Sequence, residues 1–138
     1  MKLTFQKAAL LNGINIVLKA VPSKTTMPIL ECILIDASTN EIKLTGNDME
    51  LGIETKVEGE ILEKGKIALD AKLFSEIIRK LADSDAIVTI ESDEKFNTVI
   101  SCENSVFKIQ GKDGEEFSYL YPQLLNIKST SSSTITVG

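Results

Sequence analysis

Two stretches of the chain, residues 2–18 (KLTFQKAALLNGINIVL) and 66–82 (KIALDAKLFSEIIRKLA), share one pattern of apolar residues. Each begins with an alternation of polar and apolar residues, which is typical of a half-buried strand. Each then changes to apolar residues three and four positions apart, which predicts an amphipathic helix. The stretches superimpose with a shift of 64 residues, so that Leu3 aligns with Ile67 and Ile14 with Ile78. This repetition predicts an internally duplicated fold.

The helices that this pattern predicts cover residues 7–20 and 71–82. Pro22 ends the first helix, because proline cannot continue a helix, and Gly13 weakens it by about 1 kcal/mol relative to alanine. Asp70 is suited to cap the start of the second helix.

The second helix has two distinct faces. Its apolar residues Phe74, Ile78 and Leu81 are expected in the core, whereas Lys72 and Arg79 are seven residues apart and lie on the opposite face.

Strand patterns outnumber helix patterns along the chain. After each helix come three segments that alternate, so the two repeat units are predicted at residues 1–60 and 65–111. The sequence therefore predicts an α+β domain in which two helices pack on antiparallel sheet. Residues 111–124 lose periodicity. The predicted strands are residues 2–6, 29–37, 41–45, 49–57, 66–70, 86–91, 96–102 and 105–110.

The composition excludes several classes of protein. A chain of 138 residues and 15.1 kDa corresponds to one ordinary domain. It has no histidine, which excludes Ser-His-Asp nucleophiles and histidine-containing zinc motifs. No apolar run approaches the length of a membrane span, and no signal peptide is evident, so a cytoplasmic protein without membrane contact is expected. Cys32 and Cys102 are interpreted as buried thiols.

The charge balance argues against a tight DNA binder that works by bulk charge. There are 15 basic and 20 acidic residues, which gives a net charge of -5. A few basic residues could still gather on one face, and Lys72, Arg79 and Lys80 are candidates for such a face. Two interpretations stay open: an ordinary solvated helix surface, or a weakly basic surface that faces phosphate.

A group of carboxylates follows the strand at 41–45. Asp48, Glu50 and Glu54 share one parity, and carboxylates on one strand face could bind a divalent metal. Alternatively, Asp48 caps its own backbone in a turn. The turn is favoured, because a metal site needs more convergent oxygens than one strand supplies.

Several motifs in order resemble the N-terminal domain of the bacterial DNA polymerase III beta subunit, the sliding clamp. The resemblance extends from Met1 to about Leu125. Lys112-Asp113 stands where the family has Leu-Pro. The residues that carry the resemblance are 24–30 (KTTMPIL), 42–50 (IKLTGNDME, with Asn47 in place of Thr), 107–111 (FKIQG) and 115–117 (EEF).

This resemblance implies a non-catalytic processivity factor without cofactor or metal. Residues 1–125 would be the first of three clamp domains, and residues 126–138 the linker and first strand of the second. Two subunits would close head to tail around duplex DNA and tether the polymerase, with weak and sequence-independent DNA contact. Polymerase and clamp loader would bind through the other two domains.

The resemblance also assigns site residues. By position, Lys24 is the DNA-contacting basic residue, and Lys72, Arg79 and Lys80 are further candidates from the helix face. The ring contact with another subunit is implied at Leu73, Ile77, Phe107 and Ile109. The last strand, residues 105–110, is expected at a sheet edge, where unpaired backbone groups favour self-association.

Two other functions are considered from the residues alone. One is a metal-dependent enzyme built on Asp48, Glu50 and Glu54. The other is a stand-alone protein-interaction module with no DNA role, in which the duplication is only structural.

Overall fold

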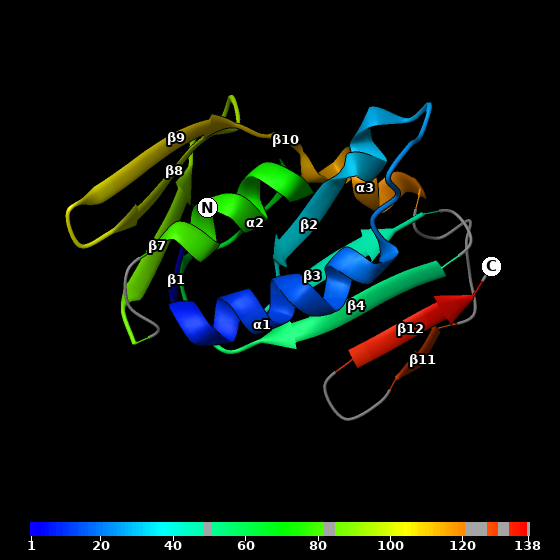
Figure 1. Ribbon diagram of the computed structural model, residues 1–138, viewed down its shortest axis with the longest axis horizontal. Coiled ribbons are helices and arrows are strands. Elements are labelled where there is room, and N and C mark those ends of the chain that lie inside the picture. The colour runs from blue at the N-terminus through cyan, green and yellow to red at the C-terminus, as the bar shows by residue number, and fades with distance from the viewer. Residues whose placement is uncertain (49–50, 82–84, 121–126, 130–132, 138) are drawn as a thin grey trace.

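The computed structural model describes residues 1–48, 51–81, 85–120, 127–129 and 133–137. In these residues the chain forms antiparallel sheets and two main helices, α1 (Lys7–Val17) and α2 (Ala71–Lys80). The two helices lie side by side and pack against the sheets (Figure 1). The predicted α+β architecture is confirmed, but the strands are divided between two sheets.

The first sheet has five strands in the order β5-β1-β7-β8-β9, and all neighbours are antiparallel. Because β9 ends this order, the expected position of residues 105–110 at a sheet edge is confirmed. The bounds are β1 (Lys2–Gln6), β5 (Glu60–Glu63), β7 (Ile87–Ser92), β8 (Asn97–Cys102) and β9 (Ser105–Gln110).

The second sheet has seven strands in the order β10-β6-β2-β3-β4-β12-β11. Its last two strands pair with each other in antiparallel fashion, and β12 pairs with β4. The bounds are β2 (Cys32–Ala37), β3 (Ile42–Asn47), β4 (Leu51–Val57), β6 (Gly65–Asp70), β10 (Lys112–Asp113), β11 (Ile127–Ser129) and β12 (Ser133–Val137).

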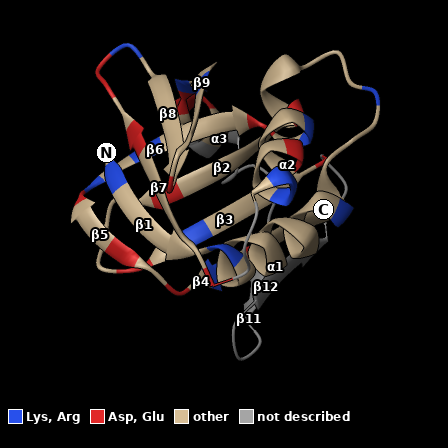
Figure 2. Ribbon diagram, turned by 60° about the vertical axis from the view of Figure 1, so that its left-hand side comes forward, with Lys and Arg blue, Asp and Glu red and all other residues tan. Residues whose placement is uncertain are grey.

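The two sheets are copies of one arrangement, which confirms the duplication. Exchanging β1, β2, β3, β4 and β5 with β6, β7, β8, β9 and β10, each for its counterpart, converts the first sheet's order into the first five strands of the second. Each repeat places its first strand in the sheet that holds the other repeat's three strands, and Figure 2 shows β1 beside β7. The repeats are therefore interlocked, which the sequence pattern did not predict.

A direct contact marks the axis that relates the repeats. Arg79 Nη2 on α2 donates a hydrogen bond to Asn15 Oδ1 on α1 at 3.0 Å, and these residues are 64 positions apart. This separation equals the shift that superimposes the repeats. Equivalent residues can touch only near their symmetry axis, so the axis passes between α1 and α2 at this pair.

Side chains and backbone together fix the ends of the helices. Asp70 Oδ1 accepts a hydrogen bond from the Leu73 backbone N–H at 2.9 Å, which confirms the predicted cap of α2. At the other end, Lys7 Nζ donates to the Leu81 carbonyl, where a cation complements the helix dipole. α1 continues as a short 3₁₀ turn, η1 (Leu18–Ala20).

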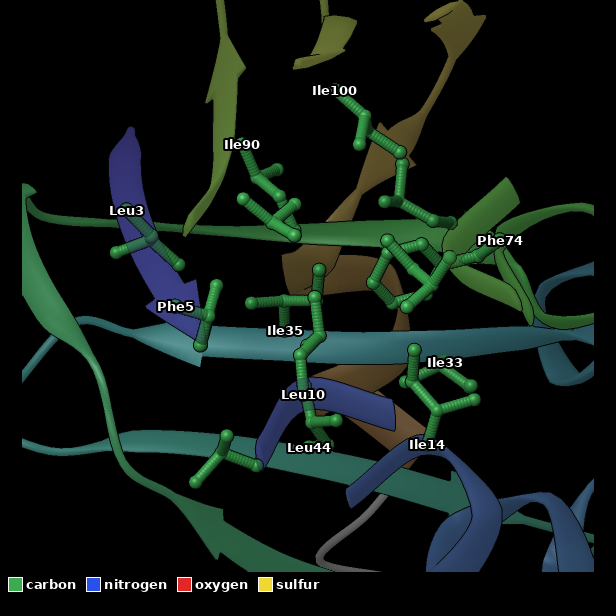
Figure 3. Close-up of a cluster of buried hydrophobic side chains, with 14 of the residues drawn as sticks. Leu3, Phe5, Leu10, Ile14, Ile33, Ile35, Leu44, Phe74, Ile90 and Ile100 are labelled. Atoms are coloured by element: carbon green, nitrogen blue, oxygen red, sulfur yellow. The ribbon is translucent and has the colours of Figure 1, made fainter. Parts of the chain in front are cut away.

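The main core lies between the helices and the sheets (Figure 3). Its members come from both repeats, and the aligned pair Ile14 and Ile78 is fully buried, as is the pair Leu3 and Ile67. The predicted burial of Phe74, Ile78 and Leu81 is confirmed. Cys32 and Cys102 are buried thiols, as expected, and burial raises the pKa of the Cys32 thiol to about 11.

Gly13 has a packing reason that outweighs its poor helix propensity. A Cβ at this position would lie 2.6 Å from Val57 Cγ2 and 3.2 Å from Leu44 Cδ1. Glycine therefore lets α1 approach β4 more closely than any other residue would.

A second, smaller cluster lies under the helix α3 (Gly114–Leu120) and the 3₁₀ turn η2 (Pro28–Glu31). Phe117 is almost fully buried there, beside Leu30 and Leu34. Periodicity did not predict α3, because seven residues are too few to establish a helical period. The cluster members are Ile29, Leu30, Cys32, Leu34, Ala68 and Phe117.

Other element boundaries also differ from the prediction. The strand predicted at 29–37 begins only at Cys32, because the preceding residues form η2, with Pro28 at its first position. The strand β5 was not predicted, since its ends are Glu60 and Glu63 and its pattern looks polar. Among the described residues, no helix has the length and apolar content needed to cross a bilayer.

Candidate nucleic-acid interface

The basic residues of α2 lie on its solvent face. Lys72 and Arg79 are exposed, as predicted, and so is Lys80, and Figure 2 shows basic and acidic segments along α2. Asp70, which caps α2, and Glu76 on α2 are exposed as well. Three positive charges against two negative ones leave α2 only weakly basic, which suits a surface that touches phosphate without holding it tightly.

Lys24 lies in the loop that joins η1 to η2. The loop is anchored on its far side, because Ile29 and Leu30 are buried in the second cluster. Inside the loop, Thr25 Oγ1 accepts a hydrogen bond from the Met27 backbone N–H at 3.0 Å. Lys24 itself is exposed, so its side chain extends into solvent from a loop whose C-terminal end is anchored in the second cluster.

A polar strip on α1 adjoins the basic residues of α2. Asn12 and Asn15 are exposed, and Asn15 makes the hydrogen bond to Arg79. Asn15 was not predicted as a site residue. The 64-residue shift between the repeats could have identified Asn15, because this shift makes Asn15 the counterpart of Arg79.

A cavity of about 530 Å³ lies between residues 18–23 and α2. Lys72, Arg79 and the carboxylate residue Glu31 line it. Ser75 also lines it, and within the described part of the chain its buried hydroxyl has no hydrogen-bond partner. The counterpart of Ser75 in the first repeat is the larger Leu11. The mixed charges of the cavity favour no single ligand.

The carboxylates considered for a metal site are used in other ways. Asp48 Oδ1 accepts a hydrogen bond from the Leu51 backbone N–H at 2.6 Å, which confirms the turn interpretation. Glu54 lies 3.6 Å from Lys43 Nζ in an ion pair on adjacent strands. Glu50 lies outside the described residues. Among those described, no group of three potential metal ligands is found.

The residues assigned to a ring contact lie on α2 and β9. Leu73 is 43% exposed, whereas Ile77 is only 5% exposed and belongs to the main core. Phe107 and Ile109 are half-buried and pack against the core. Phe107 faces the helices, since its cross-strand partner Ile100 is fully buried. Phe107 is therefore less exposed than a residue on the solvent face of β9 would be.

The edge strands of the two sheets are equivalent but differently used. β4 is the counterpart of β9, and β4 pairs with β12 through five antiparallel residue pairs. In the described residues β9 pairs only with β8, so its outer backbone edge is open. Val106 on this strand is 58% exposed and was not predicted as a site residue, because an apolar residue in a strand is normally assigned to the core.

Comparison with known proteins gives consistent matches. Residues 1–122 match the family model described as the DNA polymerase III beta subunit, N-terminal domain. The chain is 40% identical over 132 residues to the beta sliding clamp of Bacillus subtilis, which covers 90% of this chain and 34% of that protein. It is 37% identical over 128 residues to the beta sliding clamp of Staphylococcus epidermidis, which covers 87% of this chain and 33% of that protein.

Solved structures agree with these relatives. A putative DNA polymerase III beta subunit from Eubacterium rectale is 67% identical with a TM-score of 0.83, covering 86% of this chain and 32% of that one. The sliding clamp from Bacillus subtilis is 36% identical with a TM-score of 0.81, and the match covers 94% of this chain and 34% of that one. The chain therefore spans about a third of the length of the relatives it matches.

Proposed function

Because the chain belongs to the family of the DNA polymerase III beta subunit, N-terminal domain, we propose that it is the first domain of a sliding clamp. The complete protein would form a head-to-tail ring of two subunits around duplex DNA and tether the replicative polymerase. It would act as a processivity factor in the cytoplasm and would carry out no catalysis itself.

The observation that carries this proposal is the pair of equivalent edges. One edge, β4, is already extended by β12. The other edge, β9, is open in the described residues and lies in the same place in its own repeat. An open strand edge is a template for pairing with another chain. At the β4 edge, the domain continues its sheet within the chain. At the equivalent β9 edge, it would continue its sheet with a second subunit. Such a domain can be repeated around a ring.

The ring contact on this domain is proposed at Leu73, Ile77, Phe107 and Ile109. Leu73 supplies exposed apolar surface, and half-buried Phe107 and Ile109 border the open edge. Ile77 contributes from within the core. Residues 1–125 would form this domain and residues 126–138 the linker and first strand of the next one. Polymerase and clamp loader would bind through the remaining domains.

Lys24, Lys72, Arg79 and Lys80 are proposed to face the DNA backbone. A ring that slides needs few phosphate contacts and no base readout, because its hold on DNA is topological. The net charge of -5 is compatible with this, since an acidic exterior disfavours DNA on the wrong surface.

The test uses the full-length protein that carries this domain. Loaded onto DNA, it should be retained on closed circles and lost from linear duplex, because only free ends allow a ring to slide off. Leu73→Glu should abolish retention on circles. Leu62→Glu, with a comparably exposed side chain on the distant strand β5, is the matched control and should not change retention. Equal retention on circular and linear DNA would exclude a topological hold and favour a protein-interaction module.

A further inference from the structure

We propose that Asn15 is a positioning residue that holds the Arg79 guanidinium in place for a phosphate of the DNA backbone. This inference rests on the proposed DNA-facing role of α2 and adds to it an uncharged residue from α1. Arg79 would touch the phosphate, and Asn15 would act only through Arg79.

The geometry places this pair at the centre of the two-helix surface. Asn15 and Arg79 are both exposed, and they lie where the symmetry axis passes between α1 and α2. The hydrogen bond runs from Arg79 Nη2 to Asn15 Oδ1 at 3.0 Å. Arginine has five N–H donors arranged as a planar fork, so one bond to an amide oxygen leaves the others for a phosphate.

The chemistry of the anchor distinguishes Arg79 from other basic residues. Lys43 and Lys56 on the second sheet are within 4 Å of Glu54 and Glu41, whose carboxylates compensate their charge. Asn15 is neutral, so it can orient Arg79 without cancelling the positive charge that a phosphate would sense. Orientation without neutralisation is what a weak, repeated phosphate contact requires.

The physical effect of the anchor is preorganisation. A free arginine side chain occupies many rotamers, and ordering it during binding lowers affinity. When Asn15 orders Arg79 in the unbound protein, that entropic cost is no longer part of DNA binding. Removing Asn15 should therefore weaken DNA binding even though Asn15 itself need not touch DNA.

A purely structural role for the bond makes the opposite prediction. If the bond only joined α1 to α2, its loss would lower the stability of the fold. Under the positioning role, by contrast, Asn15→Ala should keep or raise the midpoint of thermal unfolding, because alanine is a better helix former than asparagine. A variant that binds DNA less well without being less stable separates the two roles.

The experiment is a double-mutant cycle on the 138-residue chain. ¹⁵N-labelled Asn15→Ala, Arg79→Ala and the double variant are titrated with a short mixed-sequence duplex by NMR at several low salt concentrations. The Arg79 side-chain N–H signal is followed where Arg79 is present. Asn12→Ala, exposed one turn earlier on α1, is the matched control.

Asn15→Ala should weaken duplex binding by about two- to tenfold, the range expected for ordering one long side chain. The same change should have no effect in the Arg79→Ala background. Arg79→Ala should lower the slope of log affinity against log salt by about 0.9, the contribution of one phosphate contact. Asn15→Asp, which keeps an acceptor but adds a charge, should lower the slope similarly. Asn12→Ala should change neither quantity.

The outcomes separate this inference from the proposed function. If Arg79→Ala weakens binding but Asn15→Ala does not, the positioning role is wrong and the DNA-facing role of α2 stands. The same holds if Asn15→Ala weakens binding equally with and without Arg79. If Arg79→Ala changes neither affinity nor salt slope, the DNA-facing role of Arg79 is wrong, and the positioning role with it.

Discussion

Gly13→Ala is a substitution for which helix propensity and core packing predict opposite results. In an exposed helix the change would stabilise the protein by about 1 kcal/mol. At this position the new methyl group would lie 2.6 Å from Val57 Cγ2, whereas carbon atoms in favourable contact are about 3.5–4.0 Å apart. Val57 is buried and β-branched, so it cannot turn away easily.

Forcing an extra methyl group into a packed core costs about 1–3 kcal/mol by itself. We expect packing to win, with a net loss of about 1–2 kcal/mol in the free energy of unfolding, measured by urea denaturation at unchanged slope. Asn12→Ala on the exposed face of α1 is the control, since it reports the propensity gain without the clash. A Gly13→Ala protein more stable than the parent would refute the argument that glycine is needed for the approach of α1 to β4.

Three further predictions follow from burial, exposure and charge. Ile78→Ala should lower the free energy of unfolding by about 2–5 kcal/mol and Lys72→Ala by no more than about 0.5 kcal/mol, measured by urea denaturation; similar losses would mean that the faces of α2 are wrongly assigned. Sedimentation equilibrium should detect concentration-dependent self-association of the chain that Leu73→Glu reduces and Leu62→Glu does not, and a strictly monomeric parent would contradict this. The Asn97 side-chain amide, which donates to Asp93, holds the pKa of that carboxyl below its ordinary value of 3.8. Its stabilising effect is therefore present above that value and is lost as the pH falls through the lower, folded-state pKa, so acid unfolding curves of Asp93→Asn should be less steep in this range.

Much of the fold could be predicted because the main repeats obey simple periods. Alternation in β1 and β6 and the three-and-four spacing in α1 and α2 reflect burial directly, and the aligned residues are buried in the structure. The interlocking of the repeats could not be predicted, since strand patterns report which residues are buried and not which strands pair. The helix α3 and the strand β5 are too short to show a period.

The candidate site was partly accessible to sequence reasoning for a similar reason. The exposure of Lys72 and Arg79 follows from their position opposite the apolar stripe of α2. Ile77 follows the same stripe and is buried, so its assignment to the ring contact came only from the family resemblance. The Asn15–Arg79 bond depends on how two helices meet across an axis, which no single helix pattern contains.

The two repeats differ at one buried position where a helix packs against the core. Gly13 in α1 has Ile77 as its counterpart in α2, by the same shift of 64 residues that separates Asn15 from Arg79. With glycine, α1 lies close against β4, and Val57 on that strand is buried. With isoleucine at the counterpart position, a branched side chain is buried in the main core, and α2 makes few close approaches to β9. Phe107 and Ile109 on β9 are half-buried beside a strand edge that is open in the described residues. The helix behind β9 therefore makes fewer close approaches to its strand than the helix behind β4 does, while the β4 edge itself is closed by its pairing with β12.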